Sequence, residues 1–541
     1  MRPTKHTLHR RHFLSTLGAT AGITVLAACG EPPVDDSTLH DGKIELLIRK
    51  PGTLDPALAS RSDEFTILKA LFEPLITVDE HGWRVPAAAA QWAESNDGLE
   101  IALTLRSNSR WMTGQPVTAD AFAWAWNRNL DPEVGGSFNY LMFPISGAQD
   151  LAYGRNNHSG TIGVSAIDDS TLRIRLEQRT SGFPARLAEA TFFPLPKAEI
   201  QSYGSDWTRP HTMRSNGQYR LVQWDDDLGI TLLRNDHYWG NPGLFREVVT
   251  RFQKNDRNPA IEFRTGAIDV APVSGTDYRE VLSNSDLRNN LKLFARAGTW
   301  LLVFNTAKSP WDRAEVRRAL AMALDRVAIV GEVFDEPTLP AWSIVPSTIL
   351  PRVVARKAPN VAGARDLLAQ AGFPGGKGLP PLRFTYHSTD TWDRLATHLT
   401  RSWRESLGVV VERDERPWRD FLAFTDDPGD FDLYRGGWTS EFRDPSNWYD
   451  DLWLSDTDYL RSHWRNALFD STVRHAGAES NPDLRRRSYL AADELLEASQ
   501  PAIGIAHHAS AYLLHPRISN FGIDPVTGGI DLRAISVNSP R

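Results

Sequence analysis

The residue with the most distinctive chemical context is Cys29, the only cysteine among 541 residues. It lies in the segment Leu26-Ala27-Ala28-Cys29-Gly30, where small residues directly precede the thiol. The apolar run over residues 17–28 is shorter than the roughly 20 residues that cross a bilayer. This pattern is typical of a signal peptide that ends in a lipobox. We therefore expect a diacylglycerol to alkylate the sulfur of Cys29 and the chain to be cut before it.

The alternative for Cys29 is an inert buried thiol, since a lone cysteine commonly behaves as a small hydrophobic residue. The position of Cys29 directly after the apolar run favours the lipidated form. Arg10-Arg11 followed by Phe13-Leu14 is a second export signal, and it fits the twin-arginine pattern. The general secretory route stays open beside the twin-arginine route. Residues 1–28 are expected to be a removed signal peptide and residues 29–42 a polar lipidated tether. The expected location is the periplasm or cell envelope, with a membrane anchor on Cys29.

Motifs for nucleophilic or metal-assisted hydrolysis do not occur in the sequence. There is no Gly-x-Ser-x-Gly elbow and no His-Glu-x-x-His pair. The segment Gly375-Gly376-Lys377-Gly378 lacks the Ser or Thr that follows the lysine of a phosphate-binding loop, so we interpret it as a turn. On a strand, His507 and His508 would face opposite ways, which disfavours a shared metal. We expect no enzymatic activity, no cofactor and no metal site.

Composition narrows the class of protein further. Removing residues 1–28 takes away four basic residues and no acidic ones, which changes the formal charge from −7 to −11. An acidic chain without a basic stripe disfavours nucleic acid as a partner. The remaining length exceeds one typical domain and predicts two or three. The 18 tryptophans suit core packing, a ligand-gripping cleft, or both.

Strands and helices alternate along the chain, as expected of an α/β protein with several lobes. Apolar-rich or alternating segments predict strands over 43–49, 99–106, 171–176 and 230–234. Helices are predicted over 314–331, 362–371, 390–407 and 483–498, and another begins after Thr118 as its N-cap. In the helix 390–407, Leu395, Leu399 and Trp403 recur every four residues and form one apolar stripe.

Seven motifs carry a resemblance to a known family through their order and spacing. They are 53–56 (TLDP), 71–75 (LFEPL), 111–122 (WMTGQPVTADAF), 215–219 (SNGQY), 234–239 (RNDHYW), 316–320 with 324–326 (VRRAL, LDR) and 435–438 (RGGW). Through them nearly the whole mature chain resembles the oligopeptide-binding proteins, which are solute-binding protein family 5. Members of this family are the extracytoplasmic solute-binding subunits of peptide ABC importers.

The resemblance implies a periplasmic-binding-protein-like α/β fold with two large lobes that close on a cleft by hinge motion. Large lobe I would comprise 43–82, 196–292 and 512–541, a smaller inserted lobe 83–195, and large lobe III 293–511. The implied function is a monomeric lipoprotein that binds oligopeptides and delivers them to the permease subunits of an ABC importer. One alternative is a binding protein for an oligosaccharide or another small polar solute. Another is an envelope hydrolase or chaperone on the same fold.

The resemblance also assigns residues to the peptide. An extended peptide would lie between Ser60-Arg61-Ser62 and Gly437-Trp438-Thr439, bonded like an added strand. Glu441 falls on the family carboxylate that captures the α-ammonium of the peptide, and it is one methylene longer. Such a carboxylate offsets the desolvation of the ammonium in a closed cleft. The alternative for Glu441 is an ordinary surface acid.

Further ligand contacts are implied at Arg435, Trp418 and Phe442. Arg435 matches a family arginine that meets a peptide carboxylate with its forked guanidinium. Its alternative is an internal salt bridge, for instance to Glu441 or Asp444. Trp418 matches a tryptophan that lines the pocket, with ordinary core packing as the alternative.

The chain departs from the family pattern where the family binds the carboxyl end of the peptide. Trp392 stands in place of a histidine, and a second family arginine falls near Thr425 or Asp426. Phe138 stands in place of a pocket tyrosine and has no hydroxyl. Amino-terminal capture is therefore expected to be retained and carboxyl-terminal capture to be altered, which leaves the preferred peptide length open.

Overall fold

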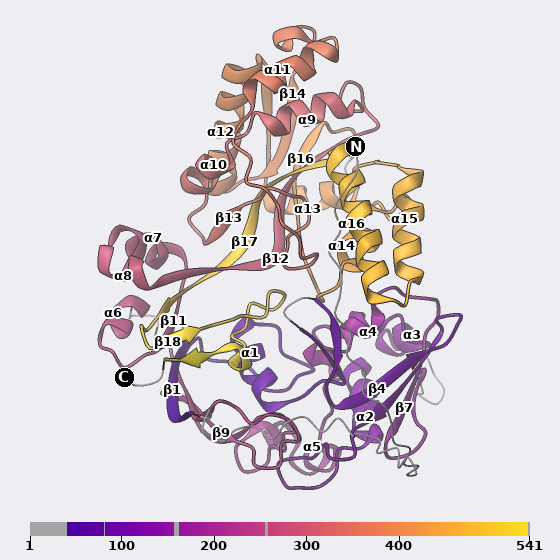
Figure 1. The fold of residues 1–541 in the computed structure, drawn as a ribbon, viewed down its shortest axis with the longest axis vertical. Helices are drawn as coiled ribbons and strands as arrows, with labels where there is room; N and C mark the ends of the chain where they lie inside the picture. Colours follow the sequence, from indigo (N-terminus) through magenta and orange to yellow (C-terminus); the bar gives the residue numbers. More distant parts are fainter. Residues whose placement is uncertain (1–39, 80–81, 156–161, 255–257, 428, 539–541) are drawn as a thin grey trace, which may run out of the picture. The chain divides into compact units, whose positions relative to one another are not determined.

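The computed structural model describes residues 40–79, 82–155, 162–254, 258–427 and 429–538. Cys29 and the pair Arg10-Arg11 lie outside these residues. The described chain forms one sheet of eleven strands, one of four strands and two of two strands, together with helices (Figure 1). This mixture confirms the predicted α/β class.

The large sheet has the order β15-β14-β16-β12-β17-β11-β1-β10-β9-β8, and β13 also pairs with β17. Most adjacent pairs are antiparallel, whereas β1 is parallel to both β10 and β11, and β14 to both β15 and β16. Its strands are β1 (His40–Ile48), β8 (Tyr219–Asp225), β9 (Gly229–Arg234), β10 (Phe245–Phe252), β11 (Val270–Val273), β12 (Leu291–Phe304), β13 (Thr338–Pro340), β14 (Leu382–His387), β15 (Val411–Arg416), β16 (Leu433–Thr439) and β17 (Ala502–Leu514).

The long strands β12 and β17 connect the two halves of this sheet. β12 pairs with β16 on one side, and β17 pairs with β11 on the other. The lobe boundaries predicted after residues 292 and 511 both fall within these strands. The register of β12 shifts between Ala295 and Thr299, which pair with Ala509 and His507 of β17. Between these two pairs β12 contains more residues than β17, so β12 forms a β-bulge. A bulge changes the direction in which the side chains of the strand point.

The smaller sheets contain the remaining strands. In the four-stranded sheet β4-β5-β7-β6, Ile101, Leu103 and Leu105 of β5 are buried while Glu100 and Ala102 are exposed. This alternation confirms the half-buried strand predicted there. The strands are β2 (Ile76–Val78), β3 (Arg84–Pro86), β4 (Ala89–Glu94), β5 (Glu100–Leu105), β6 (Val164–Ala166), β7 (Thr171–Arg175), β18 (Ile518–Asn520) and β19 (Ser536–Val537).

Helices cover these sheets, and in the described part of the chain none is long and apolar enough to cross a membrane. The α-helices are α1 (Ser62–Leu71), α2 (Ala119–Leu130), α3 (Ala148–Ala152), α4 (Phe183–Arg186), α5 (Lys197–Tyr203), α6 (Pro259–Arg264), α7 (Gly275–Ser283), α8 (Ser285–Asn290), α9 (Ala314–Met322), α10 (Arg326–Val333), α11 (Val361–Gln370), α12 (Asp390–Leu407), α13 (Trp418–Asp426), α14 (Ser446–Trp453), α15 (Ala467–Ala478) and α16 (Pro482–Ser499).

Most predicted helices form, but the one predicted over 314–331 is wrong as a single helix. It is divided into α9 and α10, because the Asp325 carboxylate accepts hydrogen bonds from the N–H groups of Val327 and Ala328 and so begins a new helix. The helix predicted over 390–407 is confirmed at both ends as α12. Its stripe residues Leu395, Leu399 and Trp403 are fully buried.

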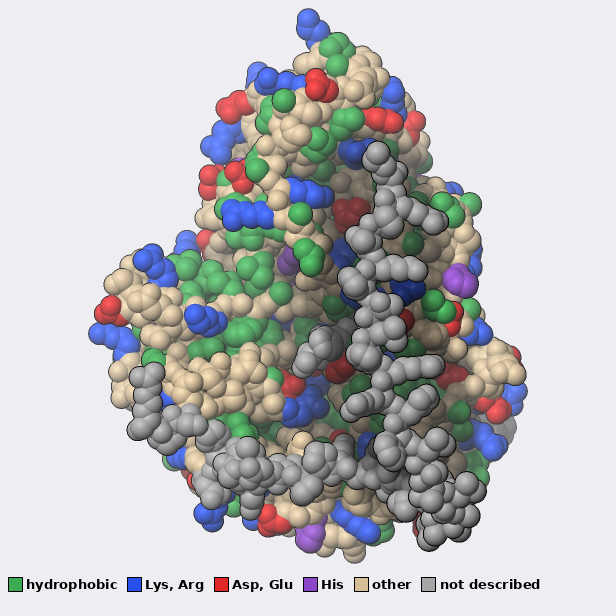
Figure 2. Space-filling model, viewed as in Figure 1, with side chains coloured by type: hydrophobic (Ala, Val, Ile, Leu, Met, Phe, Trp, Pro, Cys, Tyr) green, Lys and Arg blue, Asp and Glu red, His purple; other side chains and the backbone are tan. Residues whose placement is uncertain are grey.

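Charged side chains of both signs are distributed over the face of the molecule drawn in Figure 2. Blue and red side chains are interspersed on this face, and the described residues drawn there form no continuous basic area.

Candidate ligand-binding site

A cavity of about 520 Å³ is lined by the whole of one predicted backbone segment, Ser60–Ser62, and by the last residue of the other, Thr439. Ser60, Arg61 and Ser62 line it at the start of α1, and Thr439 and Glu441 line it at the end of β16. The other walls come from Arg49, Asp63, Phe65, Phe138, Tyr140, Leu141, Glu189, Ala190, Thr191, Arg296, Ser440, Val526 and Thr527. Segments far apart in the sequence therefore meet where the resemblance places the ligand.

The segment before α1 is held by the buried carboxylate of Glu64. This carboxylate accepts hydrogen bonds from the N–H groups of Ser60 (2.8 Å), Arg61 (2.9 Å) and Gly52 (2.9 Å). Burial by itself raises the pKa of Glu64, but these hydrogen bonds outweigh it and keep the pKa below its ordinary value. The N–H groups of Ser60 and Arg61 are thus already bonded.

The segment on β16 offers a free strand edge. One edge of β16 pairs with β12 over its whole length, from Leu433 to Thr439. The other edge pairs with β14 only at Leu433 and Tyr434, and no described strand continues the pairing from Arg435 to Thr439. An unpaired edge presents a row of N–H and C=O groups that an extended chain can join. This edge ends at the cavity, where Thr439 is exposed.

Glu441 presents a partly buried carboxylate without an ion-pair partner among the described residues. Its backbone N–H donates to Asn447 (2.9 Å), which fixes its position. Burial raises the pKa of its side chain, whereas the hydrogen bond from the Tyr140 hydroxyl and the nearby Arg186 charge lower it. The loss of solvation on burial therefore affects the charged Glu441 carboxylate more than Tyr140 and Arg186 together stabilise it. A cationic group in the cavity would supply the missing compensation.

Tyr140 is a site residue that the sequence analysis does not identify. The resemblance leaves Phe138 in place of the family tyrosine, but Tyr140, two residues later, supplies a hydroxyl to Glu441. Both residues lie at the 3₁₀ turn η2 (Asn139–Met142), and their rings are 6.0 Å apart. The sequence Phe138-Asn139-Tyr140 contains a signal for this role. Tyr140 lies only two residues after the position of the family tyrosine, and the short turn brings its hydroxyl to the Glu441 carboxylate.

Phe442 lies in the core rather than in the cavity wall. Its side chain is 0% exposed, and the Arg186 guanidinium stacks over its ring at 4.5 Å. Arg186 donates to the carbonyl of Leu141, and its Nε is buried without a partner. Phe442 therefore supports the cation beside Glu441 and does not line the cavity.

Arg435 is enclosed by an aromatic cage, which we define as Trp300, Trp392 and Phe421. The guanidinium lies 4.7 Å, 4.5 Å and 5.6 Å from these three rings. Burial lowers the pKa of Arg435 to about 10, and its Nε has no hydrogen-bond partner. Arg435 does not line the cavity that contains Glu441.

The expected alternative for Arg435, a salt bridge to Glu441 or Asp444, is not present among the described ion pairs. Asp444 instead accepts two hydrogen bonds from Arg485, at 2.6 Å and 3.0 Å. The side chains of this pair are only 4% and 10% exposed. The pair anchors the chain just after Glu441.

The predicted tryptophans occupy different surroundings. Trp392 is 5% exposed within the aromatic cage, and Trp418 is 54% exposed and lies 4.8 Å from the ring of His387. Trp438 donates to the side chain of Asn447, the residue that also holds Glu441. Gly437 packs on Trp300, where a Cβ would come within 2.9 Å of the ring. Neither Gly437 nor any of the three tryptophans lines the cavity, so their predicted ligand contacts stay predictions.

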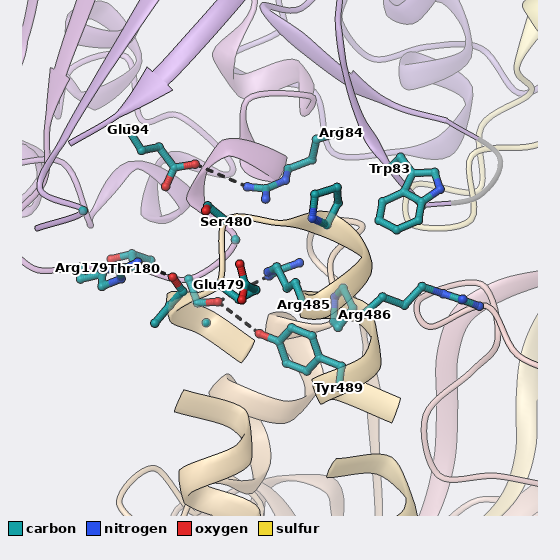
Figure 3. A pocket seen from close by; sticks show the side chains of 18 of the residues that line it. Trp83, Arg84, Glu94, Arg179, Thr180, Glu479, Ser480, Arg485, Arg486 and Tyr489 are labelled. Atoms are coloured by element: carbon teal, nitrogen blue, oxygen red, sulfur yellow. Dashed lines mark hydrogen bonds and ion pairs between the residues drawn. The ribbon is translucent and has the colours of Figure 1, made fainter. Parts of the chain in front are cut away.

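A slightly larger cavity, about 590 Å³, lies between β3–β4 and the turn from α15 to α16 (Figure 3). It contains none of the predicted ligand residues. Two of its cations have acidic neighbours: the buried Arg485 is paired with Asp444, and the partly buried Arg84 lies 3.8 Å from Glu94. Volume alone therefore does not distinguish the two cavities, whereas the unpaired strand edge and the unpaired carboxylate make the smaller cavity the candidate site.

The fold and this cleft define a periplasmic-binding-protein-like protein. More specifically, the chain belongs to the bacterial extracellular solute-binding proteins, family 5, because the sequence model described as the middle part of that family matches residues 84–459. This confirms the family resemblance drawn from the seven motifs. The family binds solutes and is not catalytic.

Curated relatives align over nearly the whole chain. The periplasmic murein peptide-binding protein MppA of Escherichia coli is 29% identical over 88% of this chain and 89% of its own length. The periplasmic oligopeptide-binding protein OppA of Salmonella typhimurium is 28% identical over 89% and 91%. The probable deoxycholate-binding periplasmic protein YgiS of Escherichia coli is 30% identical over 87% and 89%.

Solved structures of MppA confirm the fold. The unliganded open form of this murein tripeptide-binding protein aligns with a TM-score of 0.82 and 27% identity, over 92% of this chain and 98% of MppA. A second MppA structure covers similar lengths but has a TM-score of 0.58. The described residues thus match the unliganded open form better.

Proposed function

We propose that this protein is an extracytoplasmic binding protein that captures oligopeptides in the cleft between Ser60–Ser62 and β16. Closure of the lobes around the peptide would create the surface that the permease of an ABC importer recognises. Micromolar affinity, about −8 kcal/mol, would suffice for capture and still permit release.

The observation that carries this proposal is the combination at the end of β16. A free strand edge from Arg435 to Thr439 leads directly to the unpaired carboxylate of Glu441. An edge of this kind binds backbone of any sequence, and a carboxylate at its end suits the ammonium of a peptide. The relatives named for murein peptides and oligopeptides support a peptide ligand.

Calorimetric titration with short peptides tests the proposal directly. Trialanine is expected to bind, and N-acetylated trialanine is expected to bind at least tenfold more weakly, because it lacks the ammonium that Glu441 compensates. Equal affinity for the two peptides would contradict amino-terminal capture. No heat of binding with either would contradict the peptide as ligand class.

A second candidate is a non-peptide solute, and the relative named as probably deoxycholate-binding favours it. The candidate solutes also include an oligosaccharide or another small polar molecule, on which tryptophan faces would stack. Deoxycholate and an oligosaccharide mixture belong in the same titration. Binding of one of these, with no response to trialanine, would replace the peptide proposal.

Lipid anchoring is the remaining part of the proposal and rests on the lipobox at Cys29. Replacing Cys29 with Ser removes the acylated sulfur, so the variant is expected to move from the membrane fraction to the soluble extracytoplasmic fraction. Fractionation and metabolic labelling with a radioactive fatty acid measure this. Unchanged membrane association and labelling in Cys29→Ser would contradict the anchor.

A further inference from the structure

Arg296 projects from the bulge of β12 into the same cavity as Glu441. Over this bulge the backbone leaves its pairing with β17 and bonds elsewhere. The N–H of Ala297 donates to Pro525 (2.8 Å), and its carbonyl accepts from Ser440 (2.7 Å). Since Ser440 precedes Glu441, one backbone hydrogen bond holds the segments that carry Arg296 and Glu441 side by side.

The guanidinium of Arg296 is only partly satisfied by the protein. Its Nη2 donates to the carbonyl of Val526 (3.0 Å), but its Nε is buried without a hydrogen-bond partner. No described carboxylate forms an ion pair with it, and nearby Asp524 is already paired with Lys69. Burial lowers the pKa of Arg296. An uncompensated, partly buried guanidinium favours an incoming carboxylate.

The other arginines that line the cavity, and the predicted ligand residue Arg435, are less suited to this task. Arg61 is already paired with Glu64 and donates to the carbonyl of Lys50. Arg49 is exposed, where an ion pair contributes little. Arg435 is enclosed in the aromatic cage, away from the cavity. Arg296 is therefore the cation of this cavity that is both partly buried and unpaired among the described residues.

We propose that Arg296 binds a carboxylate of the ligand, so that the cavity selects ligands whose ammonium and carboxylate lie close together. This inference rests on the proposed function and adds a second charged anchor to it. Glu441 and Arg296 would hold the two charges of one zwitterion. The carboxylate would come from the carboxyl end of a short peptide or from an acidic side chain near its amino end.

Calorimetry with four probes separates these sources. The probes are dialanine, trialanine, trialanine amide, and glutamyl-alanyl-alanine amide, in which only the side chain provides a carboxylate. The wild-type protein is expected to bind at least one carboxylate-bearing probe tenfold or more tightly than trialanine amide, as expected of a charged hydrogen bond. The probe with this advantage identifies the source of the carboxylate.

Arg296→Met is expected to abolish that preference and to leave trialanine amide within threefold of wild type. Arg404→Met is the matched control, because it removes the same charge from an exposed position on α12 outside this cavity and should keep the preference. Equal binding of acid and amide probes by the wild type, or a preference that survives in Arg296→Met, would overturn the inference while leaving peptide capture intact. A wild type that binds none of the probes contradicts the proposed function itself, and the inference with it.

Discussion

Replacing Glu441 with Gln should weaken the binding of trialanine by about 100-fold, and it should leave N-acetylated trialanine unchanged. A glutamine side chain at this position would keep the shape of the glutamate but would leave the desolvated ammonium uncompensated. Loss of one partner of a buried charge pair costs about 3 kcal/mol or more, which corresponds to this change in affinity. Isothermal titration calorimetry on both proteins measures it.

Glu479→Gln is the matched control, since it removes the same charge from the larger cavity. It should bind trialanine like the wild type. An equal loss of affinity for free and acetylated peptide in Glu441→Gln would contradict a role in ammonium capture. An effect in Glu479→Gln alone would move the site to the larger cavity.

The same titration has a pH dependence of defined sign. Burial raises the pKa of Glu441 in the free protein, and an ammonium in contact with it would lower that pKa in the complex. Affinity should therefore be greatest above the raised pKa and should fall as the pH decreases through it. Glu441→Gln should remove this dependence. A wild-type affinity that stays constant as the pH is lowered from neutral through the carboxylate range would contradict the contact.

Replacing Asp444 with Asn should destabilise the protein by about 3 to 5 kcal/mol, because it leaves the guanidinium of Arg485 buried without its carboxylate. Burial would raise the pKa of Asp444, but Arg485 outweighs it and lowers that pKa to about 2. The midpoint of urea unfolding, compared with wild type, measures the loss. The loss matters for function because Asp444 anchors the chain three residues after Glu441.

Asp456→Asn is the matched control for this stability effect. It breaks the ion pair with Arg474, and the side chains of Asp456 and Arg474 are 67% and 55% exposed, so the change should stay below about 1 kcal/mol. The contribution of Asp444 should be complete above the ordinary pKa of an aspartate, about 3.9, and should decrease as the pH falls towards about 2. Equal destabilisation by the two substitutions would contradict the buried pair.

Local patterns in the sequence are sufficient to predict many of the helices and strands. The stripe of Leu395, Leu399 and Trp403 predicts α12, and the period-two pattern of 99–106 predicts β5. The helix and the strand follow from the sequence because each is determined by its own apolar period. The expected position of residues 437–441 beside the cleft comes from the family resemblance instead, because no local pattern contains it.

The rest depends on contacts that no local pattern contains. Asp325 is the N-cap of α10 and divides the helix predicted over 314–331. An aspartate inside a continuous helical pattern does not by itself predict that a new helix begins there. The bulge that aims Arg296 at the cavity arises from the register between β12 and β17, which are about 200 residues apart in the sequence. The enclosure of Arg435 likewise requires three rings from β12, α12 and α13.

The central claim is that the cleft holds a peptide, and native mass spectrometry of the protein as purified from cells tests it most directly. The account predicts bound species of several masses that denaturation releases as short peptides, each with a free amino terminus. Fragmentation of these peptides would also report whether a carboxylate recurs near that terminus. A single non-peptide mass in the released fraction would contradict peptide capture.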